Sequence, residues 1–461
     1  MKPFAILKIG LSLGVLLASA AVRADDGIPP PPTALDPGSA VNPVSIVSGA
    51  GVRVGEGTTL RPQVGLETGY VSNVFYTNNA PIGAGLLRVL AEVGAGSLPS
   101  QRLLERSTSQ GTDPNDALQS PTYGGNPTSA GDFQYSFNLY AAYDQYLSGN
   151  DAVTSQGGLS GGLLFRGIVN PQAPLQLAFQ EHFEREIRAT NFESNDDTNR
   201  DVNNLDLRIN LFPTGRSLGG FLYYQNTIDV FEEGTQQFAN RLQNVLGLHV
   251  NWQWLPLTRV YVDVSGGYYT GVGAKSEKIN SYPLVAIAGI QTALSLNTVL
   301  NAYAGYTNGF YASGPSYSSP LGGVFLGYRY SPLGRFTLRY GFEHQDSINA
   351  NFYRDHVVQA SLEQFFAPVL FYVRPELRFR EYDGTIVMGT AGAGVSGLTR
   401  NDTIIAATVG ARYNFRDWIA ATLDYELQMV STDFRYDPGT GQPFNPSYTR
   451  HELLLGVRAA Y

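Results

Sequence analysis

Glu184 and Glu186 are the residues whose type and spacing come closest to acid–base chemistry. In an extended chain, residues two apart project from the same face, so both carboxylates would point in one direction. Two carboxylates in unlike environments can serve as a general acid and a general base. The alternative is a polar wall that needs no substrate, and we favour it because a strand that borders a water-filled interior commonly carries such a face.

Other signals for catalysis or for a cofactor are weak. Gly392, Gly394 and Gly397 form a G-x-G-x-x-G pattern, but no βαβ unit surrounds it, so nothing indicates a dinucleotide site. The histidines are dispersed and lack the spacing of zinc ligands; they are His182, His249, His344, His356 and His451. We therefore predict that the protein is not an enzyme and has no cofactor and no metal site.

Charged residues of both signs recur at alternate positions in many segments, as in "NNLDLRINLF" at 203–212. Two interpretations remain open: a hydrogen-bonding wall for a polar solute or glycan, or paired charges that fill the interior of any large barrel. The candidate lumen-lining residues are Glu184, Glu186, Asp206, Arg208, Arg339, Glu343, Arg374, Glu376, Arg378, Arg380, Asp424, Glu426 and Arg458.

The elements that must position these charges are strands. About eighteen segments alternate with a period of two, such as "FQYSFNLYAAY" at 133–143 and "DTIIAATVGARYNF" at 402–415. Tyr, Phe and Gly are abundant, with 28, 24 and 51 residues, and only 15% of residues are charged. No segment beyond the first residues is apolar enough for a transmembrane helix. We predict an all-β fold, a transmembrane antiparallel up-and-down β-barrel of about 18 strands.

The lengths of the connections favour a membrane barrel over a soluble β-protein. Short turns such as "LPLT" at 255 and "SLNT" at 295 alternate with long connections such as "GVGAKSEKINS" at 271. Outer-membrane barrels have short periplasmic turns and longer extracellular loops. The segment "YDGTIVMGTAGAGVSGLTR" at 382–400 could constrict the lumen or stand out from the surface, and the sequence does not decide between the two.

The chain ends carry targeting signals. Residues 1–24 have the Lys-flanked apolar run and the small residues of a secretory signal peptide, with cleavage near Ala24. Residues 25–58 are rich in Pro and predict an extended periplasmic linker, and residues 59–461 predict the barrel. At the C-terminus, Gly456, Ala459 and Tyr461 resemble the signal that the outer-membrane barrel assembly machinery reads, although Leu454 stands where a polar residue is usual.

One connection breaks the pattern of short periplasmic turns. Residues 97–131 form an insertion between the second and third barrel strands, on the predicted periplasmic side. The segment could be a plug or a docking arm for a periplasmic partner, or a disordered insertion, as its Pro, Ser, Thr and Gly content would allow.

The segment "GLETGYVSNVFYTNN" at 65–79 carries a family resemblance. Tyr70, followed by Ser72-Asn73-Val74-Phe75, resembles the "YdDN(I/V)F" stretch that opens the putative β-barrel porin 2 family, with Ser72 in place of the usual Asp. The resemblance implies an outer-membrane porin associated with exopolysaccharide export, as in myxobacterial Wzx/Wzy-type systems.

We therefore predict a conduit for secreted polysaccharide in the outer membrane of a Gram-negative bacterium. Its expected partners are outer-membrane lipid, the barrel assembly machinery, a periplasmic polysaccharide-export protein and the polysaccharide itself. The net charge of −8 gives no reason to expect nucleic-acid binding. A structural or adhesion barrel in a surface or motility complex, and a general diffusion porin, are the alternatives.

Overall fold

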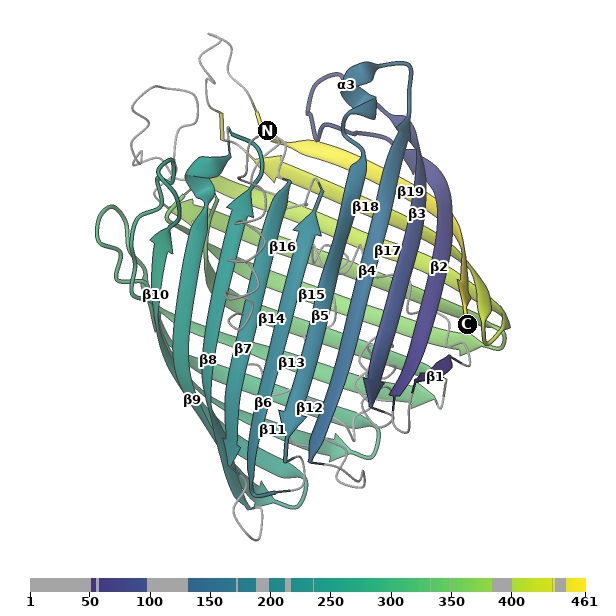
Figure 1. Ribbon diagram of the computed structural model, residues 1–461. Helices are drawn as coiled ribbons and strands as arrows, with labels where there is room; N and C mark the ends of the chain where they lie inside the picture. Colours follow the sequence, from purple (N-terminus) through teal and green to yellow (C-terminus); the bar gives the residue numbers. More distant parts are fainter. Residues whose placement is uncertain are drawn as a thin grey trace, which may run out of the picture.

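The computed structural model shows an antiparallel sheet that closes on itself (Figure 1). It describes residues 51–54, 58–97, 132–170, 173–187, 199–211, 217–234, 236–331, 333–348, 350–383, 400–432, 434–435 and 445–461. The predictions for the signal peptide, for most of the linker, and for most of the 97–131 insertion and of the 382–400 loop fall outside these residues and remain predictions.

In the part of the chain that the structure describes, the strands follow one another without a long helix between them. They are β1 (Val52–Val54), β2 (Thr58–Val71), β3 (Ala84–Ser97), β4 (Phe133–Leu147), β5 (Gly158–Val169), β6 (Leu175–Glu186), β7 (Arg200–Leu211), β8 (Leu218–Phe231), β9 (Arg241–Leu255), β10 (Thr258–Gly271), β11 (Leu284–Ser295), β12 (Thr298–Asn308), β13 (Ser318–Ser331), β14 (Gly334–Asp346), β15 (Phe352–Phe366), β16 (Val369–Asp383), β17 (Arg400–Arg416), β18 (Ile419–Thr432) and β19 (Tyr448–Ala460). Of the predicted insertion and loop, Ser97 belongs to β3, Tyr382 and Asp383 to β16, and Arg400 to β17. Two short helical turns, α3 (Asp151–Thr154) and η2 (Gln237–Ala239), lie in connections. In the described part of the chain, no helix is long and apolar enough to cross a membrane.

Strands β2 to β19 form a closed ring of 18 strands. Each pairs antiparallel with the next, and β19 returns to β2 with Glu452 opposite Val71 and Ala460 opposite Gln63. The ring leaves no strand edge along most of its height, so the backbone amides and carbonyls are paired within the sheet. The predicted fold class and strand number are confirmed.

Strand β1 adds to this ring at the point where β19 ends. The Tyr461 amide donates to the Pro62 carbonyl at 3.0 Å, and Val52 then lies opposite Leu60 on the same edge of β2. This short strand therefore covers the part of β2 that the C-terminus leaves unpaired. Residues 52–54 fall within the predicted linker, because a strand of three residues is too short to show a period of two.

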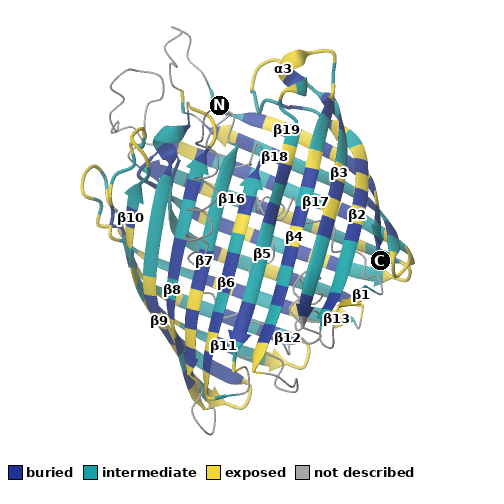
Figure 2. Ribbon diagram, in the orientation of Figure 1, coloured by how far each residue is buried: buried dark blue, intermediate teal, exposed yellow. Residues whose placement is uncertain are grey.

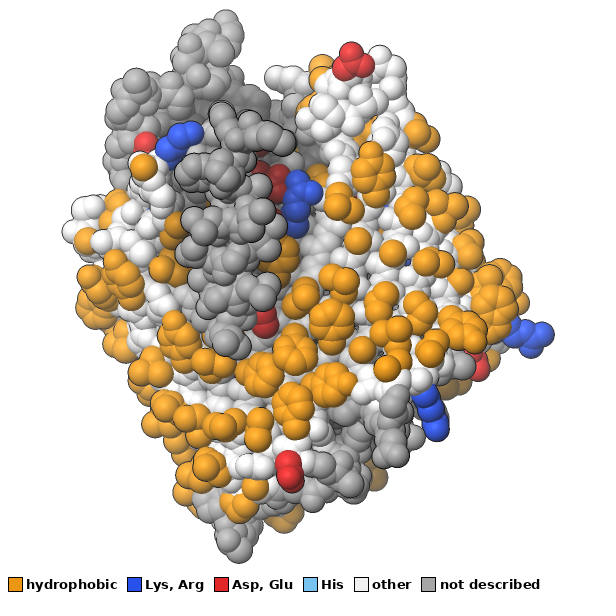
Figure 3. Space-filling model, in the orientation of Figure 1, with side chains coloured by type: hydrophobic (Ala, Val, Ile, Leu, Met, Phe, Trp, Pro, Cys, Tyr) orange, Lys and Arg blue, Asp and Glu red, His pale blue; other side chains and the backbone are white. Residues whose placement is uncertain are grey.

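The two faces of the sheet differ in the way that the alternation predicts (Figure 2). On β2, Val64 and Leu66 are 59% and 54% exposed, whereas Glu67, which follows Leu66 and faces the other way, is 2% exposed. Hydrophobic side chains cover much of the outer surface in the space-filling view (Figure 3). An apolar outer face and a polar inner face are the inverse of a soluble protein and suit a lipid surround.

The connections differ in length between the two rims. The turns that join β9 to β10 and β11 to β12 consist of two residues each, 256–257 and 296–297. At the other rim, residues 72–83, 148–157 and 272–283 form connections of ten or more residues. Both ends of the ring, the start of β2 and the end of β19, lie at the rim with short turns. This rim is the predicted periplasmic side of the barrel, and its orientation in the membrane remains a prediction.

This orientation predicts which positions are accessible from outside the cell. Gly149 lies in an exposed long connection, and Leu296, which is 85% exposed, lies in a short turn. The chain has no native Cys. We expect Gly149→Cys, and not Leu296→Cys, to react with a membrane-impermeant maleimide on intact cells, and both to react after lysis. The opposite pattern would reverse the orientation.

The outer face predicts the effect of a buried charge. Leu207 on β7 and Val409 on β17 are 40% and 44% exposed and point outward. Arg at either site would face hydrocarbon at a cost of about 2–4 kcal/mol near the midplane. We expect Leu207→Arg and Val409→Arg to lower the urea midpoint of unfolding in lipid vesicles, whereas Leu207→Phe should change it little. Equal midpoints for all three variants would show that these positions do not face lipid.

Candidate functional site

The inner wall of the barrel is the candidate site, and ion pairs dominate one side of it. Arg380 on β16 forms two parallel hydrogen bonds to Asp355 on β15, each 2.8 Å long. Its guanidinium also lies 3.7 Å from the centroid of the Tyr353 ring. Arg378 lies 3.4 Å from the same carboxylate and also pairs with Glu376 on its own strand. The paired geometry holds each long side chain against the wall.

A second cluster closes the seam of the ring. Arg458 on β19 pairs with Glu67 on β2, and both side chains are almost completely buried, with exposed fractions of 0% and 2%. Arg88 on β3 reaches the same Glu67 at 3.4 Å and binds Asp144 on β4 through two hydrogen bonds of 2.6 and 2.8 Å. Four neighbouring strands are therefore linked by one alternating chain of charges.

A third cluster lies on strands β4 to β9. Glu184 accepts a hydrogen bond of 2.6 Å from the Tyr140 hydroxyl, and Glu186 accepts one of 2.5 Å from Arg200. Asp229 then lies 3.4 Å from Arg200 and 2.7 Å from Arg241. The two glutamates thus have separate partners on different strands, and each is held as part of the wall.

The remaining candidate residues also have partners on the inner face. Asp206 accepts two hydrogen bonds of 2.9 Å from Arg208. Arg374 lies 3.1 Å from Glu363, and Arg339 pairs with Glu343 at 2.5 Å. The other two are acceptors. Asp424 accepts a hydrogen bond from the Tyr372 hydroxyl, and Glu426 accepts one of 2.7 Å from the Gln428 side chain. All of the candidate lumen-lining residues are buried or half-buried.

Several residues that form ion pairs in these clusters are not among the residues predicted from the sequence. Asp355, Glu363, Glu67 and Arg200 complete pairs with predicted residues on other strands, and Arg88 in turn pairs with Glu67. A period of two shows which residues share a face of one strand, but the register between strands selects the partner. A signal was present nevertheless, because each of these residues occupies an inward position by the same alternation.

The inner wall contains no arrangement that indicates catalysis among the described residues. Gly158 to Gly162 fit the G-x-S-x-G pattern, but they lie within strand β5 and not at a strand-to-helix turn. The Ser160 hydroxyl donates to the Ala142 carbonyl at 3.4 Å. No group of three His, Asp or Glu side chains in the described ranges could hold a metal ion.

A repeated tyrosine–glycine pair lines the wall between the charged clusters. In each pair, a tyrosine on one strand lies opposite a glycine on the next strand. The tyrosine ring occupies the space that a larger residue in place of the glycine would fill with its side chain. A Cβ at Gly247 would lie 2.1 Å from the Tyr223 ring, and one at Gly289 would lie 2.3 Å from the Tyr261 ring. The five pairs in the described residues are Tyr140 with Gly162, Tyr223 with Gly247, Tyr261 with Gly289, Tyr303 with Gly323 and Tyr372 with Gly410.

The hydroxyl groups of these tyrosines reach one strand further. Tyr223 donates to Asp263 at 2.9 Å, and Tyr261 donates to Asn301 at 3.0 Å. Each ring therefore lies along the wall across three strands and does not project toward the barrel axis. Aromatic rings that cover cross-strand glycines also fix the strand register.

Strands β11 and β12 carry the uncharged side of the wall. Their inward residues are Val285, Ile287, Gly289, Gln291, Ala293, Val299, Asn301, Tyr303, Gly305 and Thr307. These positions offer amide, hydroxyl, aromatic and small apolar groups and no ionised side chain. The interior is therefore two-sided, with ion pairs on one side and neutral groups on the other.

The "SNVF" segment forms a loop that is hydrogen-bonded to the first residues of β19. The Asn73 side chain, 1% exposed, donates to the carbonyls of Thr77 at 2.8 Å and Thr449 at 3.1 Å. Ser72 accepts a 2.8 Å hydrogen bond from the His451 amide through its hydroxyl, a role that an Asp carboxylate could also fill. This stretch therefore has a structural role at the long-loop rim.

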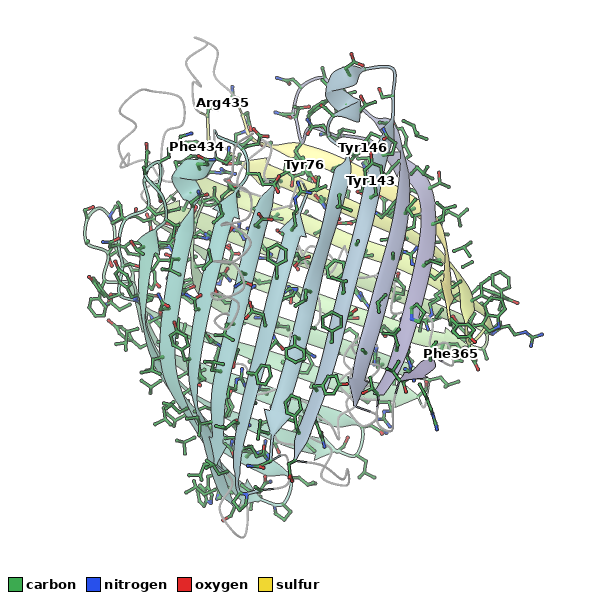
Figure 4. The ribbon with its side chains drawn as sticks, viewed as in Figure 1. Tyr76, Tyr143, Tyr146, Phe365, Phe434 and Arg435 are labelled. Carbon is green, nitrogen blue, oxygen red and sulfur yellow. The ribbon has the colours of Figure 1, made fainter. Side chains whose placement is uncertain are left out.

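The same loop explains Leu454 in the C-terminal segment. Val74 is completely buried and packs in a cluster with Val71, Leu86, Tyr146 and Leu454. Figure 4 shows Tyr146 at the long-loop rim, close to the loop that carries Tyr76. An inward polar residue at position 454 would lie in this apolar cluster, so the departure from the usual C-terminal pattern has a packing cause.

The residues of the proposed assembly signal occupy different surroundings. Gly456 faces inward, where an added Cβ would lie 2.6 Å from the Thr422 hydroxyl and 3.0 Å from Glu67. Ala459 lies on the outward face, and Tyr461 is 69% exposed at the rim with short turns. Gly456 is therefore required by packing at the seam whether or not the assembly machinery reads it.

Side-chain contacts bind several long connections to one another. Lys278 in the 272–283 connection donates to the carbonyls of Ile348 at 3.0 Å and Ala350 at 3.3 Å, and also to that of Ser347. These three acceptors lie between β14 and β15. An ammonium group surrounded by carbonyl oxygens holds the two connections together.

Tyr311 makes a second link at this rim. It lies between β12 and β13, and its hydroxyl donates to Asp346 and to the Asn351 carbonyl, the latter at 2.9 Å. Burial and the neighbouring Asp346 carboxylate raise the pKa of Tyr311 well above its usual value, so the hydroxyl remains a donor. Connections from β10 to β15 therefore form one cross-linked part of the rim.

Comparison with known proteins finds similar solved structures of low sequence identity. No family model matches the sequence, and no curated protein matches it. OccAB2 from Acinetobacter baumannii is 8% identical, with 88% of this chain and 98% of that chain covered and a TM-score of 0.44. OpdK from Pseudomonas aeruginosa is 8% identical, with 87% and 99% covered and a TM-score of 0.41. The siderophore receptor PirA from Pseudomonas aeruginosa is 8% identical, with 87% and 80% covered and a TM-score of 0.39.

Proposed function

We propose that this chain is an outer-membrane β-barrel that conducts polar solutes in a Gram-negative bacterium. The observation that carries the proposal is the closed ring of 18 strands, apolar outside and polar inside. Only a helix or a closed barrel satisfies its backbone in lipid. Barrels of this strand number are wide enough to enclose an aqueous channel.

Secreted polysaccharide is the cargo that we propose for this channel. The tyrosine rings lie flat along the wall, and β11 and β12 present neutral hydrogen-bonding and aromatic groups. Sugar rings have apolar faces and many hydroxyl groups, so such a wall offers weak contacts along a chain of sugars. The resemblance of the 70–75 segment to a family associated with exopolysaccharide export supports the same cargo.

Pairing of the wall charges suits the passage of an uncharged polymer. Arg380 is satisfied by Asp355, and Arg88 by Asp144, through hydrogen bonds of 2.6–2.8 Å. A passing hydroxyl can exchange hydrogen bonds with such groups without meeting an uncompensated charge. The partners in this proposal are outer-membrane lipid, the barrel assembly machinery and a periplasmic polysaccharide-export protein that delivers the polymer.

A general diffusion porin is the second candidate function. Ion pairs such as Arg208 with Asp206 and Arg200 with Glu186 leave little net field on the inner wall. A pore with balanced charges selects weakly among small solutes, as a general porin does.

Gene deletion combined with planar-bilayer recording tests the proposal. We expect the deletion to abolish surface polysaccharide while its precursor accumulates, expression of the full chain to restore export, and the purified barrel to conduct ions with weak selectivity. Normal polysaccharide with slower uptake of small solutes would instead establish the diffusion porin. A barrel that neither conducts nor affects export would refute both functions and favour the structural or adhesion barrel.

A further inference from the structure

A groove of about 480 Å³ lies on the outer face of strands β8 to β11, toward the long-loop rim. The groove is shallow and open, so it can hold part of a molecule along the surface without enclosing it. Figure 3 shows hydrophobic side chains along the flank where β9 and β10 lie. The groove is therefore a recess in the surface that faces lipid and is not part of the inner wall.

The strand register shows how the recess arises. Tyr224, Leu246, Gly266 and Leu284 lie directly opposite one another on four successive strands, all on the outer face. Gly266 interrupts this row, and a Cβ built on it would meet no atom within 4 Å. Leu246 on one side is 57% exposed. The missing side chain thus leaves an apolar recess between two leucines.

Aromatic and polar groups border the recess on the side of the long connections. Tyr268 and Tyr282 have ring centroids 5.5 Å apart, and Tyr282 and Phe310 are 54% and 49% exposed. The Tyr224 hydroxyl donates to the Asn244 side chain at 2.7 Å. An apolar floor with a border of tyrosine and asparagine fits a molecule whose acyl part lies in the membrane and whose polar part lies at its surface.

We propose that this groove binds an acyl chain of lipopolysaccharide, with the sugar amide and hydroxyl groups of its lipid part at the Tyr224–Asn244 border. The groove is continuous with the lipid-facing surface, so a membrane lipid is the molecule that meets it. Its position near the long-loop rim selects the outer leaflet, where lipopolysaccharide is the main lipid. This inference rests on the proposed outer-membrane location and orientation.

Lipid retention by the purified barrel tests the site. The wild type would be extracted from outer membranes in mild detergent and examined by native mass spectrometry, then titrated with lipopolysaccharide and with phosphatidylethanolamine. Gly266→Leu fills the recess. Ala288→Leu adds the same side chain at an exposed outward position on β11 that lies nearer the rim with short turns. Phe310→Ser removes part of the border from an exposed connection and does not alter a strand.

We expect the wild type and Ala288→Leu to retain lipopolysaccharide in preference to phosphatidylethanolamine. Gly266→Leu and Phe310→Ser should retain roughly tenfold less, the change expected for losing contact with about two methylene groups. Equal retention by all variants, or no preference between the two lipids, would overturn the proposal. Conductance in planar bilayers is recorded for the same preparations, and a barrel that conducts but does not retain lipid would refute the lipid site alone.

Discussion

Replacing Arg458 with Met should destabilise the barrel by about 3–5 kcal/mol, the usual cost of leaving one partner of a buried ion pair uncompensated. Arg458 and Glu67 are 0% and 2% exposed, and they join the last strand to the first. Arg88, 3.4 Å from Glu67, remains in the variant and compensates part of this charge, so we expect a loss at the lower end of this range, about 3 kcal/mol. The measurement is the urea midpoint of the purified barrel in lipid vesicles, together with the heat-dependent shift of the folded band on a gel.

Two further variants separate the ion pair from a general effect of losing an arginine. Arg185→Met removes a pair with Glu232 whose side chains are 37% and 30% exposed, and such pairs contribute about 0–1 kcal/mol. The double variant Glu67→Gln with Arg458→Met removes both charges and should be more stable than Arg458→Met alone. If Arg458→Met is no less stable than Arg185→Met, the seam pair does not hold the ring closed.

The alternation of residues was sufficient to predict the fold and the two faces, because a strand repeats every two residues regardless of its neighbours. The alternation predicts that Asp206 and Arg208 face the lumen, and both side chains are buried on the inner wall, whereas Leu207 between them is exposed on the outer face. The lengths of the connections could also be predicted, because each connection is one continuous stretch of the sequence. These lengths distinguish the rim with short turns from the rim with long connections.

The contacts between strands could not be predicted in this way. Tyr261 and Gly289 are 28 positions apart, and their meeting depends on the register of β10 with β11. Glu67 and Arg458 meet only because the ring closes. The C-terminal pattern likewise could not show that Leu454 packs against Val74, because the 72–83 connection reaches that place only in three dimensions.

Adding one methyl group at Gly289 should narrow the lumen. A Cβ there would lie 2.3 Å from Cζ and 2.4 Å from the hydroxyl oxygen of Tyr261, so the ring must leave the wall and its hydrogen bond to Asn301. We expect Gly289→Ala to lower single-channel conductance in planar bilayers, with a stability loss of about 1–3 kcal/mol from overpacking. If the chain exports polysaccharide, the same variant should slow the appearance of polymer on the cell surface.

Two companion variants show whether the displaced ring is the cause. Gly327 also faces inward, but a Cβ there would lie 3.4 Å from its nearest neighbour, Phe325, so Gly327→Ala should conduct as the wild type does. Tyr261→Ala combined with Gly289→Ala removes the ring that would be displaced and should restore conductance at least to the wild-type level. A double variant that conducts as poorly as Gly289→Ala would mean that the methyl group disturbs the strands themselves. In that case the tyrosine–glycine pairs would serve only to fix the strand register and would not keep the lumen clear.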